Sequence, residues 1–137
     1  MRDSTLIKRC LEARKGAYAP YSHFAVGAAL LCADGKVYTG CNIENASFSP
    51  TICAERTAFF KAVYDGVRDF DAIAIVGGPA GQSAPEFCAP CGVCRQVMQE
   101  FCDPSSFRIV LGRSDGERKV YLLGELLPEG FGPDNLK

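Results

Sequence analysis

Apolar and polar positions along the chain alternate between a helical spacing and short, nearly continuous apolar runs. The helical spacing, with Ser4 as candidate N-cap of the first element, predicts helices over residues 4–15, 53–65, 91–102 and, more briefly, 124–127. The apolar runs are bounded by turn residues and predict strands over residues 25–41 (two strands around an Asp34-Gly35 turn), 70–78, 107–112 and 119–124.

The order of these elements predicts an α/β fold. The run FDAIAIVGG, residues 70–78, has almost no polar position, as expected of a strand covered on both faces. The succession α-β-β-α-β-α-β-β favours a mixed sheet with helices on its faces. A length of 137 residues suits one domain, so residues 1–137 are expected to fold as a single unit.

Composition and charge narrow the class of protein. Hydrophobic residues make up 47% of the chain, which is enough for a core and argues against disorder. The net charge of −1 offers no basic surplus for a nucleic-acid polymer. No apolar run is long enough to span a membrane, and the charged first 16 residues lack the apolar centre of a signal peptide. We therefore expect a cytoplasmic protein, in which the eight cysteines are free or bind metal.

Two of these cysteines form a C-x-x-C motif, Cys91-Gly92-Val93-Cys94, directly after Pro90. Proline suits the first turn of a helix, so both thiols are expected on one face near a helix N-terminus, where the helix dipole favours thiolates. The motif alone is shared by redox dithiols and metal sites.

The number of protein ligands distinguishes a structural zinc site from a catalytic one. A structural site uses four protein ligands, and no second C-x-x-C is present; a catalytic site uses three and leaves a position for water. Cys53 is the best third ligand because it also opens a predicted helix. The lone histidine, His23, lies in a loop and is the weaker candidate.

Two charged residues follow Cys53. Three thiolates around Zn²⁺ leave a net negative charge, which opposes ionisation of a bound water. The two helix N-termini and Arg56 would offset this charge. The alternative for Arg56 is a solvated charge at the surface. Glu55 is either an ordinary acid in the first turn of a helix or, beside a metal-activated water, a group that moves protons.

The pattern C-x-E…P-C-x-x-C matches the zinc deaminases, and most of the chain resembles the small, three-cysteine, homotetrameric class of cytidine deaminase. The resemblance is carried by YAPYSHFAVGAALL (18–31), GCNIENASF (40–48), CAERTAFFKAV (53–63), PCGVCRQ (90–96) and ELLPEGF (125–131). It implies a three-layer α/β/α sandwich around a five-stranded mixed sheet. It also implies a homotetramer with shared active sites.

The resemblance also implies roles for single residues. Cys53, Cys91 and Cys94 would hold one zinc ion per subunit, and Glu55 would shuttle protons. The substrate contacts would be Phe24 against the pyrimidine, Asn42 and Glu44 on the ribose 3′-hydroxyl, the Ala54 backbone on the base, and Phe131 in the site of a neighbouring subunit. Without the resemblance, Phe24 is equally a core residue, and the polar pair is equally a solvated one.

The function implied is hydrolytic deamination of cytidine and 2′-deoxycytidine to uridine and 2′-deoxyuridine in pyrimidine salvage. One alternative is a deaminase of a related aminopyrimidine nucleoside such as blasticidin S, which the Asn42 and Glu44 pair disfavours. Another is a non-catalytic zinc or redox protein, which has no need of Glu55. One departure is Phe48, where the family often has tyrosine; it is expected to alter affinity rather than the reaction.

Overall fold

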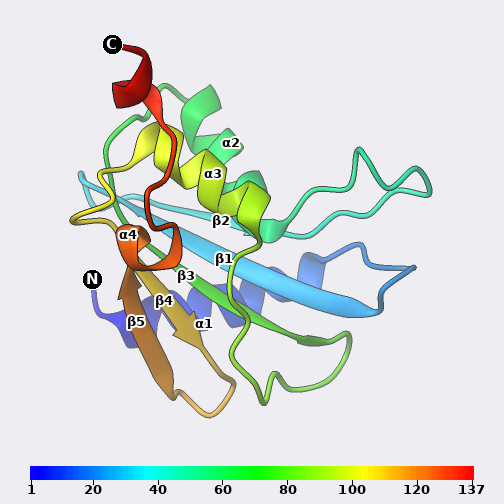
Figure 1. The fold of residues 1–137 in the computed structure, drawn as a ribbon. Helices are drawn as coiled ribbons and strands as arrows, with labels where there is room; N and C mark the ends of the chain where they lie inside the picture. The colour runs from blue at the N-terminus through cyan, green and yellow to red at the C-terminus, as the bar shows by residue number, and fades with distance from the viewer.

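A computed structural model describes residues 1–137 and contains one five-stranded sheet with helices on both faces (Figure 1). The strands are β1 (Phe24–Cys32), β2 (Val37–Cys41), β3 (Phe70–Pro79), β4 (Arg108–Gly112) and β5 (Arg118–Leu122). Their order across the sheet is β2-β1-β3-β4-β5. Only β3 and β4 pair in parallel, so the sheet is mixed, as predicted.

The helices complete a three-layer sandwich. They are α1 (Asp3–Ala13), α2 (Ala54–Tyr64), α3 (Gly92–Phe101) and the short α4 (Leu123–Leu126), with 3₁₀ turns η1 (Arg14–Gly16) and η2 (Pro133–Leu136). Helix α1 covers one face of the sheet, and α2 and α3 lie side by side on the other (Figure 1). The predicted α/β/α fold is confirmed. No helix is long and apolar enough to cross a membrane.

The central strands supply both cores because alternate side chains point to opposite faces. Ile73 and Ile75 of β3 join the core under α2 and α3, whereas Ala72 and Ala74 join the core under α1. This division explains why residues 70–78 form a nearly continuous apolar run.

The sheet face toward α1 carries more small side chains than the face toward α2 and α3, which packs against large ones. The largest cluster there joins Phe59 of α2 to Phe70, Phe101 and Phe107, with ring centroids 5.1 to 6.2 Å from Phe59. Aromatic packing of this kind fixes α2 against the sheet and against the end of α3.

The first helix departs from the sequence prediction at both ends. Its N-cap is Arg2, and Ser4 lies inside the helix, so the proposed serine cap is wrong. The helix ends at Ala13 because Arg14 enters a 3₁₀ turn. The buried Arg14 guanidinium there donates to the carbonyl oxygens of Ala25 (3.1 Å) and Gly78 (2.9 Å). The other predicted boundaries agree with the structure to within a residue or two.

Gly40 of β2 lets α2 approach the sheet closely. A Cβ atom at this position would lie 2.5 Å from the carbonyl oxygen of Ala54 and 2.7 Å from the backbone nitrogen of Ala58. Both are backbone atoms of α2, so a side chain could be accommodated only by moving the helix.

We therefore expect Gly40→Ala to lower the free energy of unfolding by about 1–3 kcal/mol, the usual cost of overpacking. Thermal denaturation followed by circular dichroism measures the effect. Gly16→Ala is the matched control, since its new Cβ would lie 3.7 Å from Cys41 Sγ, an ordinary contact. An unchanged melting temperature for Gly40→Ala would contradict the close packing of α2 on β2.

Candidate active site

Two helices begin side by side at a cluster of thiols. Cys53 is the N-cap of α2 and Cys91 the N-cap of α3, and neither side chain makes a capping hydrogen bond. Cys94 lies in the first turn of α3. The sulfur atoms are therefore free for another ligand. They also lie at the positive ends of two helix dipoles, which stabilise negative charge.

The spacing of the sulfurs suits a tetrahedral metal ion. Cys53 Sγ lies 3.7 Å from Cys91 Sγ, which lies 3.6 Å from Cys94 Sγ. Zinc–sulfur bonds of about 2.3 Å at tetrahedral angles place neighbouring sulfurs about 3.8 Å apart. All three ligand atoms lie within 4.8 Å of one another, and no other group of His, Cys, Asp or Glu residues does so, which leaves His23 outside the cluster. Three protein ligands leave the fourth position of a zinc ion open.

The cluster stabilises negative charge even before a metal binds. Hydrogen bonds from Cys94 and from Arg56 lower the pKa of Cys53 to about 5. The Nη2 atom of Arg56 lies 3.5 Å from Cys53 Sγ. The pKa of Cys94 is raised, because its thiol is hydrogen-bonded to Cys53 and partly desolvated. Arg56 is thus half-buried against a ligand sulfur and is not a freely solvated charge.

Glu55 lies beside this cluster and is only 4% exposed. Burial is the main reason that its pKa rises to about 7, and the neighbouring Cys53 adds to the increase. A carboxyl group in this range can both accept and donate a proton near neutral pH. As the second residue of α2, it lies two residues after Cys53 along the chain.

Phe24 and Ala54 lie on two different elements. Phe24 is the first residue of β1 and is 39% exposed. A Cβ atom on Gly77 of β3 would lie 2.9 Å from both the Phe24 ring and Cys88 Sγ, so the missing side chain is what lets the ring lie over the strand. Ala54 is buried as the first residue of α2.

Asn42 is bonded to the backbone that carries Phe24. Its Nδ2 donates to the Phe24 carbonyl oxygen (2.8 Å), and its Oδ1 accepts from the Val26 amide (2.9 Å). The side chain is buried and joins the segment after β2 to the start of β1. One amide hydrogen and one lone pair remain for another partner.

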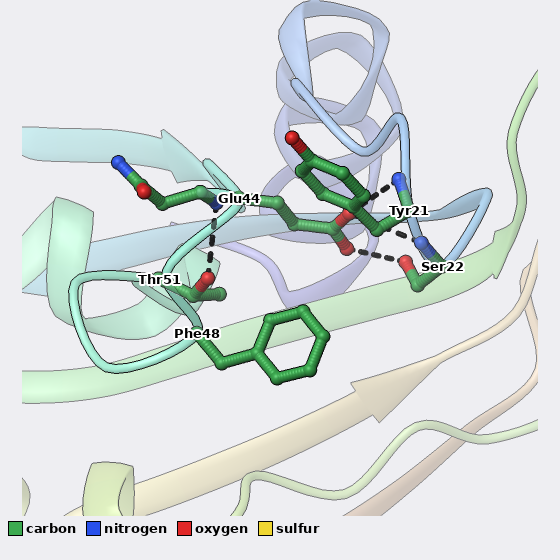
Figure 2. Close-up of a pocket in the computed structure, with 6 residues that line it drawn as sticks. Tyr21, Ser22, Glu44, Phe48 and Thr51 are labelled. Atoms are coloured by element: carbon green, nitrogen blue, oxygen red, sulfur yellow. Dashed lines mark hydrogen bonds between the residues drawn. The ribbon is translucent and has the colours of Figure 1, made fainter.

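Glu44 is half-buried and is held by the loop before β1 (Figure 2). Its carboxylate accepts from the backbone nitrogens of Tyr21 (3.0 Å) and Ser22 (3.1 Å) and from Ser22 Oγ. These hydrogen bonds, chiefly those from Ser22, lower the pKa of Glu44. The residues surround a cavity of about 350 Å³ lined by Tyr21, Ser22, Glu44, Asn45, Phe48 and Thr51.

Sequence reasoning missed Tyr21, Ser22, Asn45 and Thr51 as lining residues. A signal existed for the first two, because they stand next to Phe24 in the PYSHF motif. Phe131, by contrast, is not among the residues lining this cavity. It lies in the C-terminal segment, with its side chain 57% exposed and its carbonyl oxygen accepting from Gln96 Nε2.

Comparison with known proteins agrees with this arrangement. Residues 1–109 match the family described as the cytidine and deoxycytidylate deaminase zinc-binding region. The chain is 50% identical over 131 residues to a cytidine deaminase of Sporosarcina psychrophila, covering 96% of this chain and 92% of the relative. The crystal structure of a cytidine deaminase from Burkholderia pseudomallei superposes with a TM-score of 0.86 at 49% identity, covering 96% and 100% of the two chains.

A second solved relative, a cytidine deaminase from Mycobacterium tuberculosis, gives a TM-score of 0.79 at 38% identity and covers 96% of this chain and 99% of that one. The chain therefore belongs to the cytidine and deoxycytidylate deaminase family, whose shared region binds zinc. The three sulfurs at the helix starts can hold one such ion.

We expect the purified protein to contain about one zinc ion per chain, measured by plasma mass spectrometry against protein concentration. Cys53→Ala should lose the ion, because two thiolates and water bind zinc far more weakly than three thiolates. Cys102→Ala removes a thiol at the far end of α3 and should keep it. Full zinc occupancy in Cys53→Ala would exclude this sulfur as a ligand.

Proposed function

We propose that the protein catalyses the hydrolytic deamination of cytidine and 2′-deoxycytidine to uridine and 2′-deoxyuridine, with release of ammonia, in pyrimidine salvage. The observation that carries this proposal is the buried Glu55 beside three thiols at two helix N-termini. A purely structural zinc site or a redox dithiol has no use for a buried acid at that place.

Cys53, Cys91 and Cys94 would hold the zinc ion, which supplies a Lewis acid able to make water nucleophilic at neutral pH. The protein's own contribution to the chemistry is proton transfer. Water adds to C4 of the base, and Glu55 carries a proton from the water to N3. It then carries a second proton to the amino group, the C4–N bond breaks, and ammonia leaves.

Arg56 is proposed to act on the negative charge of the thiolate sulfurs. A hydrogen bond from its guanidinium to Cys53 Sγ withdraws negative charge from the ligand. Together with the two helix N-termini, this contact offsets the excess charge of three thiolates around a divalent ion. We assign Arg56 a role in keeping water at the metal acidic.

The substrate would lie between the thiol cluster and the loop before β1. Phe24 would contact the face or edge of the pyrimidine, and the Ala54 backbone would form a hydrogen bond with the base. Asn42 and Glu44 would bind the ribose 3′-hydroxyl with the hydrogen-bonding capacity that their contacts leave free. An ordinary ribose satisfies this pair, which favours cytidine over blasticidin S.

Phe48 lines the cavity beside Glu44 and brings no hydroxyl to it. It can pack against a sugar but cannot form a hydrogen bond with it, so we expect it to change the affinity for substrate and not the reaction. We also propose that residues 1–137 act as one deaminase domain in the cytoplasm, where a reducing environment keeps all eight cysteines from forming disulfides, as in the structure. With a net charge of −1, no nucleic-acid polymer is expected as substrate.

Replacing the proton carrier tests the chemistry directly. Glu55→Gln keeps the size of the side chain but cannot accept the proton, so we expect kcat on cytidine to fall by about 10²–10⁴-fold with zinc retained. The loss of ultraviolet absorbance of cytidine measures the rate.

Glu100→Gln is the matched control, because it makes the same chemical change at an exposed position of α3. It should keep the wild-type rate. If Glu55→Gln retains more than about a tenth of the wild-type kcat, another group moves the protons.

We further propose a homotetramer with shared active sites. Large aromatic side chains are exposed on the segment before α2 and on α2 itself, with Phe48 78% and Tyr64 90% exposed. Aromatic side chains are enriched in subunit interfaces. The exposed Phe131 would reach the active site of a neighbouring chain and cover its substrate.

Subunit mixing tests the shared site. A Glu55→Ala chain and a chain ending at Gly130 should each be nearly inactive alone. Unfolded together and refolded as a mixture, they should show activity well above the sum of the two. Some sites then combine an intact Glu55 from one chain with an intact Phe131 from the other. A fully active wild-type monomer in size-exclusion chromatography would contradict both the tetramer and the sharing.

A further inference from the structure

The C-terminal segment that carries Phe131 is bound to the helix that carries two of the thiols. Gln96 and Gln99 lie on one side of α3, on the turns that follow Cys91 and Cys94. Gln96 Nε2 donates to the Phe131 carbonyl oxygen at 2.8 Å. In Figure 1 the segment after α4 runs across α3 before it reaches the C-terminus.

The glycines on either side of Phe131 fit tightly against Gln99. A Cβ atom on Gly130 would lie 2.9 Å from Leu127 Cδ2 and 3.1 Å from Gln99 Oε1. One on Gly132 would lie 2.9 Å from Gln99 Cγ. The Gln99 Oε1 atom is buried and accepts no hydrogen bond, so this contact acts through shape. We call Gln96, Gln99, Gly130 and Gly132 the tail cradle.

Further hydrogen bonds hold the segment before and after the cradle. Arg95 Nη1 donates to the Leu126 carbonyl oxygen (2.7 Å), while its Nε donates to that of Pro90 (2.8 Å), next to Cys91. On the other side, the Gly132 amide donates to Asn135 Oδ1 (2.8 Å). The segment before Phe131 is thus bound to α3, and the turn after it is closed by its own hydrogen bond, yet Phe131 stays 57% exposed.

We propose that Gln96 and Gln99 are positioning residues that hold residues 130–132 on α3, so that the Phe131 ring projects outward in one orientation toward a neighbouring subunit's pyrimidine site. This inference rests on the proposed function. A ring on a loose tail would have to be ordered each time substrate binds, whereas the cradle orders it in advance. The gain is in substrate binding, and proton transfer at Glu55 is untouched.

Steady-state kinetics on cytidine separates this role from a merely structural one. The double variant Gln96→Ala/Gln99→Ala should raise KM roughly three- to tenfold, the cost of ordering one or two side chains, and leave kcat within about twofold. Its zinc content should equal that of the wild type. Glu100→Ala truncates an exposed side chain of the same helix and should change neither constant.

A double-mutant cycle with Phe131→Ala shows whether the cradle acts through the ring. If it does, adding Gln96→Ala/Gln99→Ala to Phe131→Ala raises KM no further. Additive effects on KM would mean that the two glutamines act elsewhere, and would overturn the proposal. So would an unchanged KM in the cradle variant of the otherwise wild-type chain.

A spectroscopic test is independent of activity. The chain has no tryptophan, so Phe131→Trp places a single reporter on the tail. We expect high fluorescence anisotropy with the cradle intact. Adding Gln96→Ala/Gln99→Ala should lower the anisotropy and increase quenching by acrylamide, whereas Glu100→Ala should not.

Equal anisotropy with and without the cradle would overturn the proposal, whatever the enzyme does. Failure of the proposed function is a separate result: the wild-type protein would not deaminate cytidine, although the tail could still be shown to be held. If the anisotropy falls and KM stays unchanged, the glutamines hold the tail without presenting Phe131 to substrate, which also overturns the proposal.

Discussion

The alignment of two helix N-termini on one face of the sheet is the constraint on which the site depends. Helix α2 can lie close to the sheet because Gly40 has no side chain, and Phe59 fixes it there against neighbouring aromatic rings. Only in that position does Cys53 come within reach of Cys91 and Cys94, which lie 38 and 41 residues further along the chain. Core packing therefore also sets the metal geometry, since a shift of either helix would change the distances between the sulfurs.

The same arrangement gives two carboxyl groups opposite properties. Glu55 enters the core with the first turn of α2, and burial raises its pKa to about 7. Glu44 stays at the surface, where hydrogen bonds from Ser22 lower its pKa and keep it charged. The first is suited to transferring protons and the second to accepting hydrogen bonds from a polar ligand. The difference arises from the element on which each residue stands.

Much of this could be predicted from local sequence. The mixed sheet with helices on its faces followed from the order and spacing of apolar runs, and its three-layer, five-stranded form from the family resemblance. The thiol cluster followed from C-x-E and P-C-x-x-C motifs at predicted helix starts. What could not be predicted are contacts between carbonyl groups and side chains far apart in sequence. Arg14 looked like one more helical residue, but it satisfies strand-end carbonyls at Ala25 and Gly78. Ser22 gave no sign that it would hold Glu44, because nothing in a loop sequence fixes its path.

Asn42 links two parts of the site that bind different parts of a nucleoside. Its amide is bonded to the backbone of Phe24 and Val26, so the residue proposed to contact the sugar also supports the residue proposed to contact the base. A change of specificity toward another sugar cannot replace Asn42 without also disturbing the backbone of Val26 and of Phe24, the residue proposed to contact the pyrimidine. Glu44 is also tied to this region, because it binds Ser22, whose hydroxyl accepts from the Phe24 amide. Selectivity for the sugar is therefore freer to change at Phe48, whose side chain makes no hydrogen bond to the segment that carries Phe24. Divergence in this family should therefore begin in the loops and reach Asn42 last.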